Sequence, residues 1–144
     1  MANILTTDID GCFEVTPKVL EDSRGKFVKI FNEDIFLEHS LNCLWKEDYY
    51  SISHKNVIRG MHFQAPPFDH TKLVTCIRGD ILDVVVDLRR SSPTYLKHLK
   101  VKLRSDIGNM LYIPNGLAHG FKVLSEEAIV LCKMTSTFNI EADS

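Results

Sequence analysis

Short apolar segments, each closed by a turn, are the feature that most constrains how this chain can fold. "KFVKIF", "NMLYIP", "HGFKVL" and "AIVLCKM" are typical of strands, and "DILDVVVDL" is a β-branched run of the kind that is buried on both faces of a sheet. Breaks rich in Gly, Pro, Asp, Asn or Ser separate them, among them "EDSRGK", "QAPPFDH" and "RRSSPTY". This pattern predicts an all-β sandwich or barrel, and a barrel of about eight strands can hold one small ligand in its mouth.

One segment, "NEDIFLEHSL", has a helical pattern instead. Asn32 is the expected N-cap, and Glu33 and Asp34 would favour the positive end of the helix dipole. Ile35 and Phe36 would share the apolar side. The sequence therefore predicts one short helix in an otherwise all-β chain.

Length and charge exclude several classes of function. The 144 residues are 44% hydrophobic and 25% charged, which fits a single domain over 1–144 with one real core. Seventeen basic and nineteen acidic side chains give a net charge of −2, so we expect no nucleic-acid partner. No stretch approaches the roughly 20 apolar residues that cross a bilayer, and "MANILTTDIDGCF" does not resemble a signal peptide. The sequence predicts a cytoplasmic protein without a membrane partner.

The stretch "VIRGMHFQ", residues 57–64, mixes polar and bulky apolar residues. With a strand period of two, Arg59 and Met61 fall on one face, and Gly60, His62 and Gln64 on the other. Such mixed faces commonly line a cavity, because a buried polar group costs free energy unless it has a partner. The pattern indicates a ligand site.

Four motifs carry a family resemblance. "EDSRGKF", "SISHKNVIRGMHFQAPP", "KLVTCIRGDILDVVVDLRRSSPTY" and "YIPNGLAHGFKVLSEEA" together resemble the dTDP-4-dehydrorhamnose 3,5-epimerases, over most of the chain and in the family's order. The resemblance implies a cupin-type jelly roll, a homodimer, and epimerisation of a nucleotide-linked 4-keto-6-deoxy sugar without an organic cofactor. The HxH pair of metal-binding cupins is missing, because Phe63 and Gln64 follow His62. We therefore expect no catalytic metal.

The chemistry of such an epimerase needs three roles. A base removes a proton next to a ketone, a cation or donor stabilises the enolate oxygen, and an acid returns a proton from the opposite face. The resemblance places the base at His62 and the enolate-stabilising ammonium at Lys72. An unperturbed histidine pKa near neutrality suits His62 to this task.

The resemblance also assigns substrate contacts. Arg24 and Arg59 match positions that meet the diphosphate and nucleotide, which suits the forked guanidinium. His119 matches a second histidine beside the reacting sugar. Gln64 is expected to line the pocket and Asp83 to join its polar network, whereas we expect Asp87 to be structural. We expect Gly60 to let the ligand approach the backbone.

The chain departs from the family pattern where the acid is expected. Cys132 stands in "LCKMTSTF" where the family has its acid tyrosine, and Phe138 replaces a second tyrosine. The family's C-terminal aspartate, which orients the base, has no counterpart before Ser144, so His62 is expected to be oriented otherwise or less firmly. A thiol at Cys132, or a water beside it, is the expected proton donor.

This altered site predicts inversion at C3 alone, in the synthesis of a surface-polysaccharide sugar. The alternatives are a 3,5-double epimerase and a nucleotide-sugar-binding or keto-isomerase cupin without epimerase activity. The nucleotide also stays open. Lys29, Glu47 and Tyr49 replace the family's glutamate, glutamine and asparagine near the base and sugar. Those changes alter the hydrogen-bond donors and acceptors offered to the base, so CDP-, dTDP- and GDP-linked sugars are all candidates.

Overall fold

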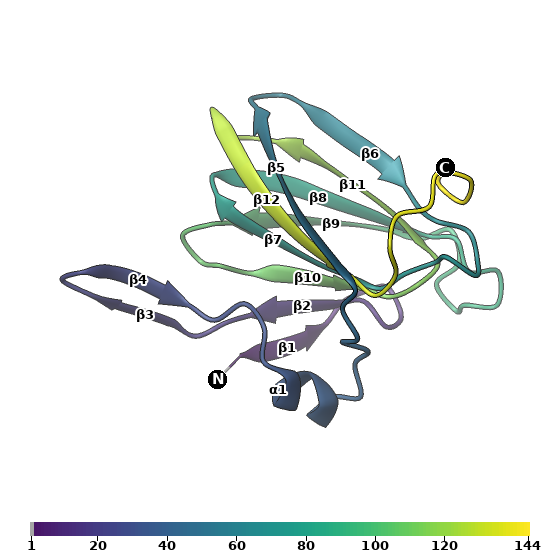
Figure 1. The fold of residues 1–144 in the computed structure, drawn as a ribbon, viewed down its shortest axis with the longest axis horizontal. Helices are drawn as coiled ribbons and strands as arrows, with labels where there is room; N and C mark the ends of the chain where they lie inside the picture. Colours follow the sequence, from purple (N-terminus) through teal and green to yellow (C-terminus); the bar gives the residue numbers. More distant parts are fainter. Residues whose placement is uncertain (1) are drawn as a thin grey trace.

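A computed structural model describes residues 2–144 as strands arranged in three antiparallel sheets, with one short helix (Figure 1). The strands are β1 (Asn3–Thr6), β2 (Phe13–Thr16), β3 (Val19–Asp22), β4 (Gly25–Val28), β5 (Glu47–His54), β6 (Ile58–His62), β7 (Lys72–Arg78), β8 (Asp80–Asp87), β9 (His98–Arg104), β10 (Met110–Ile113), β11 (Leu117–Val123) and β12 (Glu127–Met134); the helix is α1 (Glu33–Glu38). The predicted all-β class with one short helix is confirmed.

Two of the sheets form the body of the fold. The larger has the strand order β1-β2-β10-β7-β12-β5, and the smaller has the order β6-β11-β8-β9. Between them lies a core of buried apolar side chains, which includes Val74, Val85, Leu103 and Val130. Strands β5 and β6 follow one another in the chain, and each is the edge strand of a different sheet. The chain therefore crosses from one sheet to the other between them.

Strand β8 corrects one expectation from the sequence. Burial alternates along Asp80–Asp87, so the run is not buried on both faces as predicted. Ile81, Asp83, Val85 and Asp87 point inward, whereas Val84 and Val86 are only half-buried. The reason is that β8 belongs to a sheet with one face on the core, and two of its inward positions are carboxylates with polar partners.

Helix α1 closes a second core on the other face of the large sheet. Asn32 caps it as predicted, since its Oδ1 accepts a hydrogen bond of 3.2 Å from the amide of Ile35. Phe36 is buried and makes edge-on ring contacts with Trp45 and Tyr112. The β3–β4 hairpin projects from this region away from the body (Figure 1).

The four cysteines are unpaired and buried, at Cys12, Cys43, Cys76 and Cys132. For the first three this agrees with the expectation that they pack as small hydrophobic side chains. Across residues 2–144, no helix is long and apolar enough to span a bilayer.

Candidate active site

Two adjoining cavities share Tyr49, His62 and Lys72, and together we call them the intersheet cavity. One part has a volume of about 310 Å³ and is lined by strands of both large sheets; its other lining residues are Ser51, Arg59, His119, Gly120 and Phe121. The second part, of about 350 Å³, opens towards the C-terminal segment; its other lining residues are Glu47, Phe63, Gln64, His70, Met134, Phe138 and Asp143. Ionisable side chains from four strands, β5, β6, β7 and β11, thus line one cavity.

A β-bulge brings Arg59 and His62 to the same cavity. Their partners on β11 are Phe121 and His119, so three steps along β6 oppose two steps along β11. The extra residue reverses the alternation of side chains, and the predicted separation of Arg59 and His62 onto opposite faces is therefore wrong. Both side chains line the cavity part beside His119.

Gly60 makes this bulge possible. Its φ is +102°, and a Cβ there would lie 2.6 Å from both the Cα of Gly120 and the carbonyl oxygen of His119. Only glycine tolerates that conformation and approach without displacement of backbone. The structure thus gives Gly60 a role in strand pairing with β11, where the sequence suggested an approach by ligand.

Lys72 begins β7, is buried, and lines both parts of the cavity. Burial lowers the pKa of its ammonium, while the nearby Cys132, Asp83 and Asp143 act in the opposite direction. An ammonium with little water around it interacts strongly with any developing negative charge, because the local dielectric constant is low. The position therefore suits stabilisation of an enolate oxygen.

His119 and Asp83 form a buried pair on neighbouring strands β11 and β8. Nε2 of His119 lies 2.7 Å from Oδ1 of Asp83, and Oδ2 of Asp83 has no hydrogen-bond partner in the structure. The carboxylate fixes the orientation of the imidazole ring, whose other side borders the cavity. Asp83 itself does not line the cavity and reaches it through His119, in keeping with a polar network.

Arg59 and Gln64 differ in how much of their polar surface is free. Arg59 uses its Nε to donate a 2.8 Å hydrogen bond to Ser53 Oγ, and the guanidinium is exposed at the cavity. Gln64 lines the cavity, but its Nε2 donates to the carbonyl of Phe68 and its Oε1 accepts from the amide of Asn139. Gln64 thus holds the C-terminal segment in place. Both the nitrogen and the oxygen of its amide, which was predicted to bind substrate, already have hydrogen-bond partners within the protein.

The C-terminal segment contributes a carboxylate that the sequence reasoning missed. The backbone of Ser144 pairs with that of Phe63, and Asp143 forms a bridge with Gln64, so this segment lies alongside the residues that follow His62. Asp143 lines the same cavity part as His62. The expectation that His62 has no C-terminal carboxylate nearby is therefore wrong, and the signal was the acidic ending "EADS".

His70 is a second cavity residue that the sequence reasoning did not select. Burial lowers its pKa to about 4, and the charge of Lys72 acts in the same direction. Its Nδ1 lies 3.3 Å from Ser136 Oγ, and its Nε2 has no partner. His70 is thus a neutral ring beside Lys72.

Glu47 is a predicted substrate contact, and the structure places it in the cavity lining. Its carboxylate accepts a 3.2 Å hydrogen bond from the amide of Phe138.

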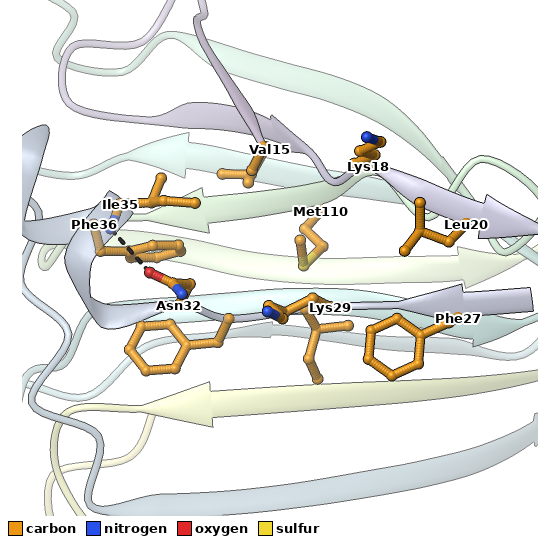
Figure 2. A pocket seen from close by; sticks show the side chains of 12 residues that line it. Val15, Lys18, Leu20, Phe27, Lys29, Asn32, Ile35, Phe36 and Met110 are labelled. Atoms are coloured by element: carbon orange, nitrogen blue, oxygen red, sulfur yellow. Dashed lines mark hydrogen bonds between the residues drawn. The ribbon is translucent and has the colours of Figure 1, made fainter.

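Two predicted substrate contacts lie outside the intersheet cavity. Arg24 stands at the tip of the β3–β4 hairpin, where its side chain is 88% exposed and pairs with Asp22. Lys29 lines a separate, largely apolar cavity of about 300 Å³ between the hairpin, α1 and the large sheet, next to Phe27 and Met110 (Figure 2). Within one copy of the chain, neither residue joins His62.

The expected acid, Cys132, does not line the intersheet cavity. It faces inward on β12, is 1% exposed, and belongs to the core cluster. Burial raises the pKa of its thiol to about 11. Its direct partner on β5 is Tyr49, which shares the same sheet face and lines both parts of the cavity.

No group of three or more His, Cys, Asp or Glu side chains within residues 2–144 is arranged to hold a metal ion. The polar side chains that line the cavity instead include histidines, cations and hydroxyl groups. Such a set suits proton transfer next to a polarised carbonyl group.

Comparisons with known proteins agree with the motifs. A sequence model of the family described as dTDP-4-dehydrorhamnose 3,5-epimerase matches residues 6–144. A relative with that name from Methanothermobacter thermautotrophicus is 43% identical over 140 residues, which are 97% of this chain and 75% of the relative. The relative of the same name from Escherichia coli is 40% identical over 98% of this chain and 77% of its own length.

Solved structures give the same result. The dTDP-6-deoxy-D-glucose-3,5-epimerase from Legionella pneumophila, in complex with dTDP-4-keto-L-rhamnose, matches with a TM-score of 0.95 and 35% identity, over 99% of this chain and 76% of that one. A 3′-monoepimerase from Streptomyces bikiniensis, in complex with dTDP-quinovose, matches with a TM-score of 0.90 and 26% identity, over 96% of this chain and 71% of that one. The predicted cupin-type jelly roll is confirmed by these likenesses.

Proposed function

This chain belongs to the dTDP-4-dehydrorhamnose 3,5-epimerase family, and we propose that it inverts C3 of a nucleotide-linked 4-keto-6-deoxyhexose. One observation carries the proposal: His62, Lys72 and His119 line a single cavity between the two sheets. Base, cation and a second imidazole are the groups that proton abstraction beside a ketone needs. The membership supports a nucleotide-sugar epimerase, and the choice of C3 rests on the altered acid position at Cys132.

The proposed reaction begins with removal of the C3 proton by His62. The electron pair of the C–H bond moves into a C3–C4 double bond, and the C4 keto oxygen becomes an enolate beside the Lys72 ammonium. His119, fixed by Asp83, holds or polarises the sugar from the neighbouring strand. Reprotonation of C3 from the opposite face restores the ketone with inverted configuration, and no net oxidation or reduction occurs.

We assign Arg59, an exposed cation that lines the cavity, to the diphosphate. Its guanidinium keeps donors available beyond the bond to Ser53, and it lies in the same cavity part as His119. A planar fork of donors suits bidentate pairing with phosphate oxygens. Glu47 and Tyr49 lie on one side of the cavity and are our candidates for contact with the nucleotide or sugar.

The experiment follows the C3 and C5 proton signals by NMR when CDP-, dTDP- and GDP-4-keto-6-deoxyglucose are each incubated with the protein in deuterated water. We expect loss of the C3 signal alone, with one of the three nucleotides, and no loss with a His62→Asn variant. Loss of both signals would identify a 3,5-double epimerase. Binding without exchange for all three substrates would favour a nucleotide-sugar-binding cupin and contradict the proposal.

The exposed position of Arg24 supports a homodimeric enzyme. Arg24 lies on a hairpin that projects away from the end of β6 carrying His62 (Figure 1). Leu20 and Phe27 are cross-strand partners on this hairpin and are 51% and 61% exposed, so they form a paired apolar surface. We propose that the hairpin docks on a second copy and that Arg24 meets the diphosphate bound there.

Mixing two inactive variants tests this arrangement. In a symmetric dimer, one His62→Asn subunit and one Arg24→Ala subunit rebuild one intact site between them. We expect the mixture, after exchange of subunits, to recover about a quarter of the wild-type rate. Arg59→Ala in place of Arg24→Ala is the matched control. Because Arg59 and His62 share a cavity within one copy, that mixture should stay inactive.

A further inference from the structure

Resting on the proposed epimerase function, we infer that the hydroxyl group of Tyr49 returns the proton to the substrate on the face opposite His62. The inference starts from the layout of the intersheet cavity. Tyr49 belongs to β5 of the six-stranded sheet, and His62 belongs to β6 of the four-stranded sheet. Both line both parts of the cavity. A planar enolate held between these facing walls therefore has the imidazole on one side and the phenol on the other.

Other cavity groups are less suited to this step. Lys72 is needed as the charged partner of the enolate oxygen, and His119 comes from the same sheet as His62. His70 is a neutral ring with a pKa of about 4, and its Nε2 is covered by protein atoms. Glu47 already accepts a hydrogen bond from the Phe138 amide. Tyr49 lines the cavity on the wall facing His62 and carries an ionisable O–H, whose side-chain hydrogen-bond partner is the thiol of Cys132.

The neighbouring Cys132 lacks access to the substrate. It is directly paired with Tyr49 across β12 and β5, but its side chain is 1% exposed, against 46% for Tyr49. Burial raises the pKa of the Tyr49 phenol, and the interaction with Cys132 raises it further, so the phenol stays protonated at neutral pH. The buried thiol of Cys132 is thus a hydrogen-bonding neighbour of the phenol, and Tyr49 is the member of the pair that lines the cavity.

The step balances without a co-reactant. The electrons of the C3–C4 enolate double bond form a new bond between C3 and the Tyr49 proton, and the C4 carbonyl is restored. Tyr49 is left as a phenolate in the cavity that holds the Lys72 ammonium. The proton on His62 is released to solvent, and solvent reprotonates Tyr49. Each turnover therefore exchanges the substrate proton for one from water.

The test separates inversion from exchange. In deuterated water, Tyr49→Phe should lower the rate of C3 inversion at least about a hundredfold, the scale of a lost general acid. It should still replace the C3 proton by deuterium with retention, because His62 can return a deuteron to the face it deprotonates. Tyr50→Phe is the matched control, since Tyr50 is the next residue on β5 and is 66% exposed on the other face; it should invert at the wild-type rate. Cys132→Ala should lose less than tenfold.

Three results would overturn the inference. Tyr49→Phe could invert C3 at the wild-type rate, or Cys132→Ala could abolish inversion while Tyr49→Phe does not. Either would leave the proposed function standing, because exchange in the wild type would still depend on His62. No exchange in the wild type with any of the three nucleotides would overturn the proposed function and this assignment together.

Discussion

Nε2 of His119 and Oδ1 of Asp83 are 2.7 Å apart inside the smaller sheet, and both side chains are buried. The pair is arranged across β11 and β8, with Phe121 opposite Asp83 and Val85 opposite His119 in the strand register. The contact is thus diagonal between neighbouring positions. It fixes which ring nitrogen of His119 is engaged and leaves the other side of the ring for the cavity.

Asp83→Asn should impair catalysis more than folding. An amide can still contact the imidazole, but it no longer favours one orientation of the ring. We expect kcat to fall by about 10²-fold, while the free energy of unfolding changes by about 1–3 kcal/mol. Steady-state kinetics and urea denaturation measure the two quantities. Asp80→Asn on the same strand is the control and should leave kcat unchanged; equal losses in both variants would contradict a role through His119.

The pH dependence of activity should depend on Asp143. Lys72 must be charged to stabilise the enolate, and burial lowers its pKa while Asp143 opposes that effect. Asp143→Asn removes this opposition, so the pKa of Lys72 falls further and the alkaline limb of kcat moves to lower pH. A pH profile of kcat in both proteins measures the displacement.

Glu141→Gln provides the matched control for that profile. Glu141 is an exposed carboxylate in the same C-terminal turn but does not line the cavity. Its removal should leave the alkaline limb where it is in the wild type. A limb that moves equally in both variants would show a general charge effect and not a local contact with Lys72.

The fold could be predicted from local pattern, because turn residues and strand alternation are encoded over a few positions. "DILDVVVDL" shows where this reasoning fails: its composition is typical of a strand buried on both faces, yet β8 is fully buried on one face only. The carboxylates of Asp83 and Asp87 face inward because each finds polar partners. Asp87 is bound by residues of the turn that directly follows β8, whereas the partner of Asp83 is His119, 36 residues away, and such a distant partner leaves no local signal.

The site was predictable to the extent that motifs fix residues within one strand. His62, Lys72, Arg59 and His119 do converge on the predicted cavity. The sequence did not predict the β-bulge at Gly60, because a bulge depends on how β6 pairs with β11. A strict alternation of side chains along β6 does not allow for an extra residue. Arg24 and Lys29 do not line the intersheet cavity. The sequence could not predict this, because no local pattern shows whether a hairpin folds back on its own subunit or extends to another.

Gly60→Ala should be strongly destabilising, because two costs act together. Alanine is strained at φ +102°, and its Cβ would lie 2.6 Å from backbone atoms of β11. Gly25→Ala isolates the first cost: φ is +124° there, and a Cβ would meet nothing within 4 Å. We expect urea denaturation to show a loss of about 1–2 kcal/mol for Gly25→Ala and at least twice that for Gly60→Ala. Equal losses would mean that β11 moves aside at little cost.

Asp87 should make stability sensitive to acid. Burial alone would raise the pKa of its carboxyl group, but hydrogen bonds from Arg89, Ser92 and Thr94 outweigh that effect and hold the pKa well below its usual value. The carboxylate therefore stabilises the fold fully above the unfolded-state pKa near 3.9, and this contribution is lost as the pH falls towards the folded-state value. Asp87→Asn should cost about 3 kcal/mol or more at pH 7 and flatten the decline between pH 5 and pH 3, as measured by urea denaturation. Asp106→Asn, which removes an exposed partner of Arg104, should change stability by less than about 1 kcal/mol. An unchanged acid dependence in Asp87→Asn would show that other carboxylates dominate the acid response.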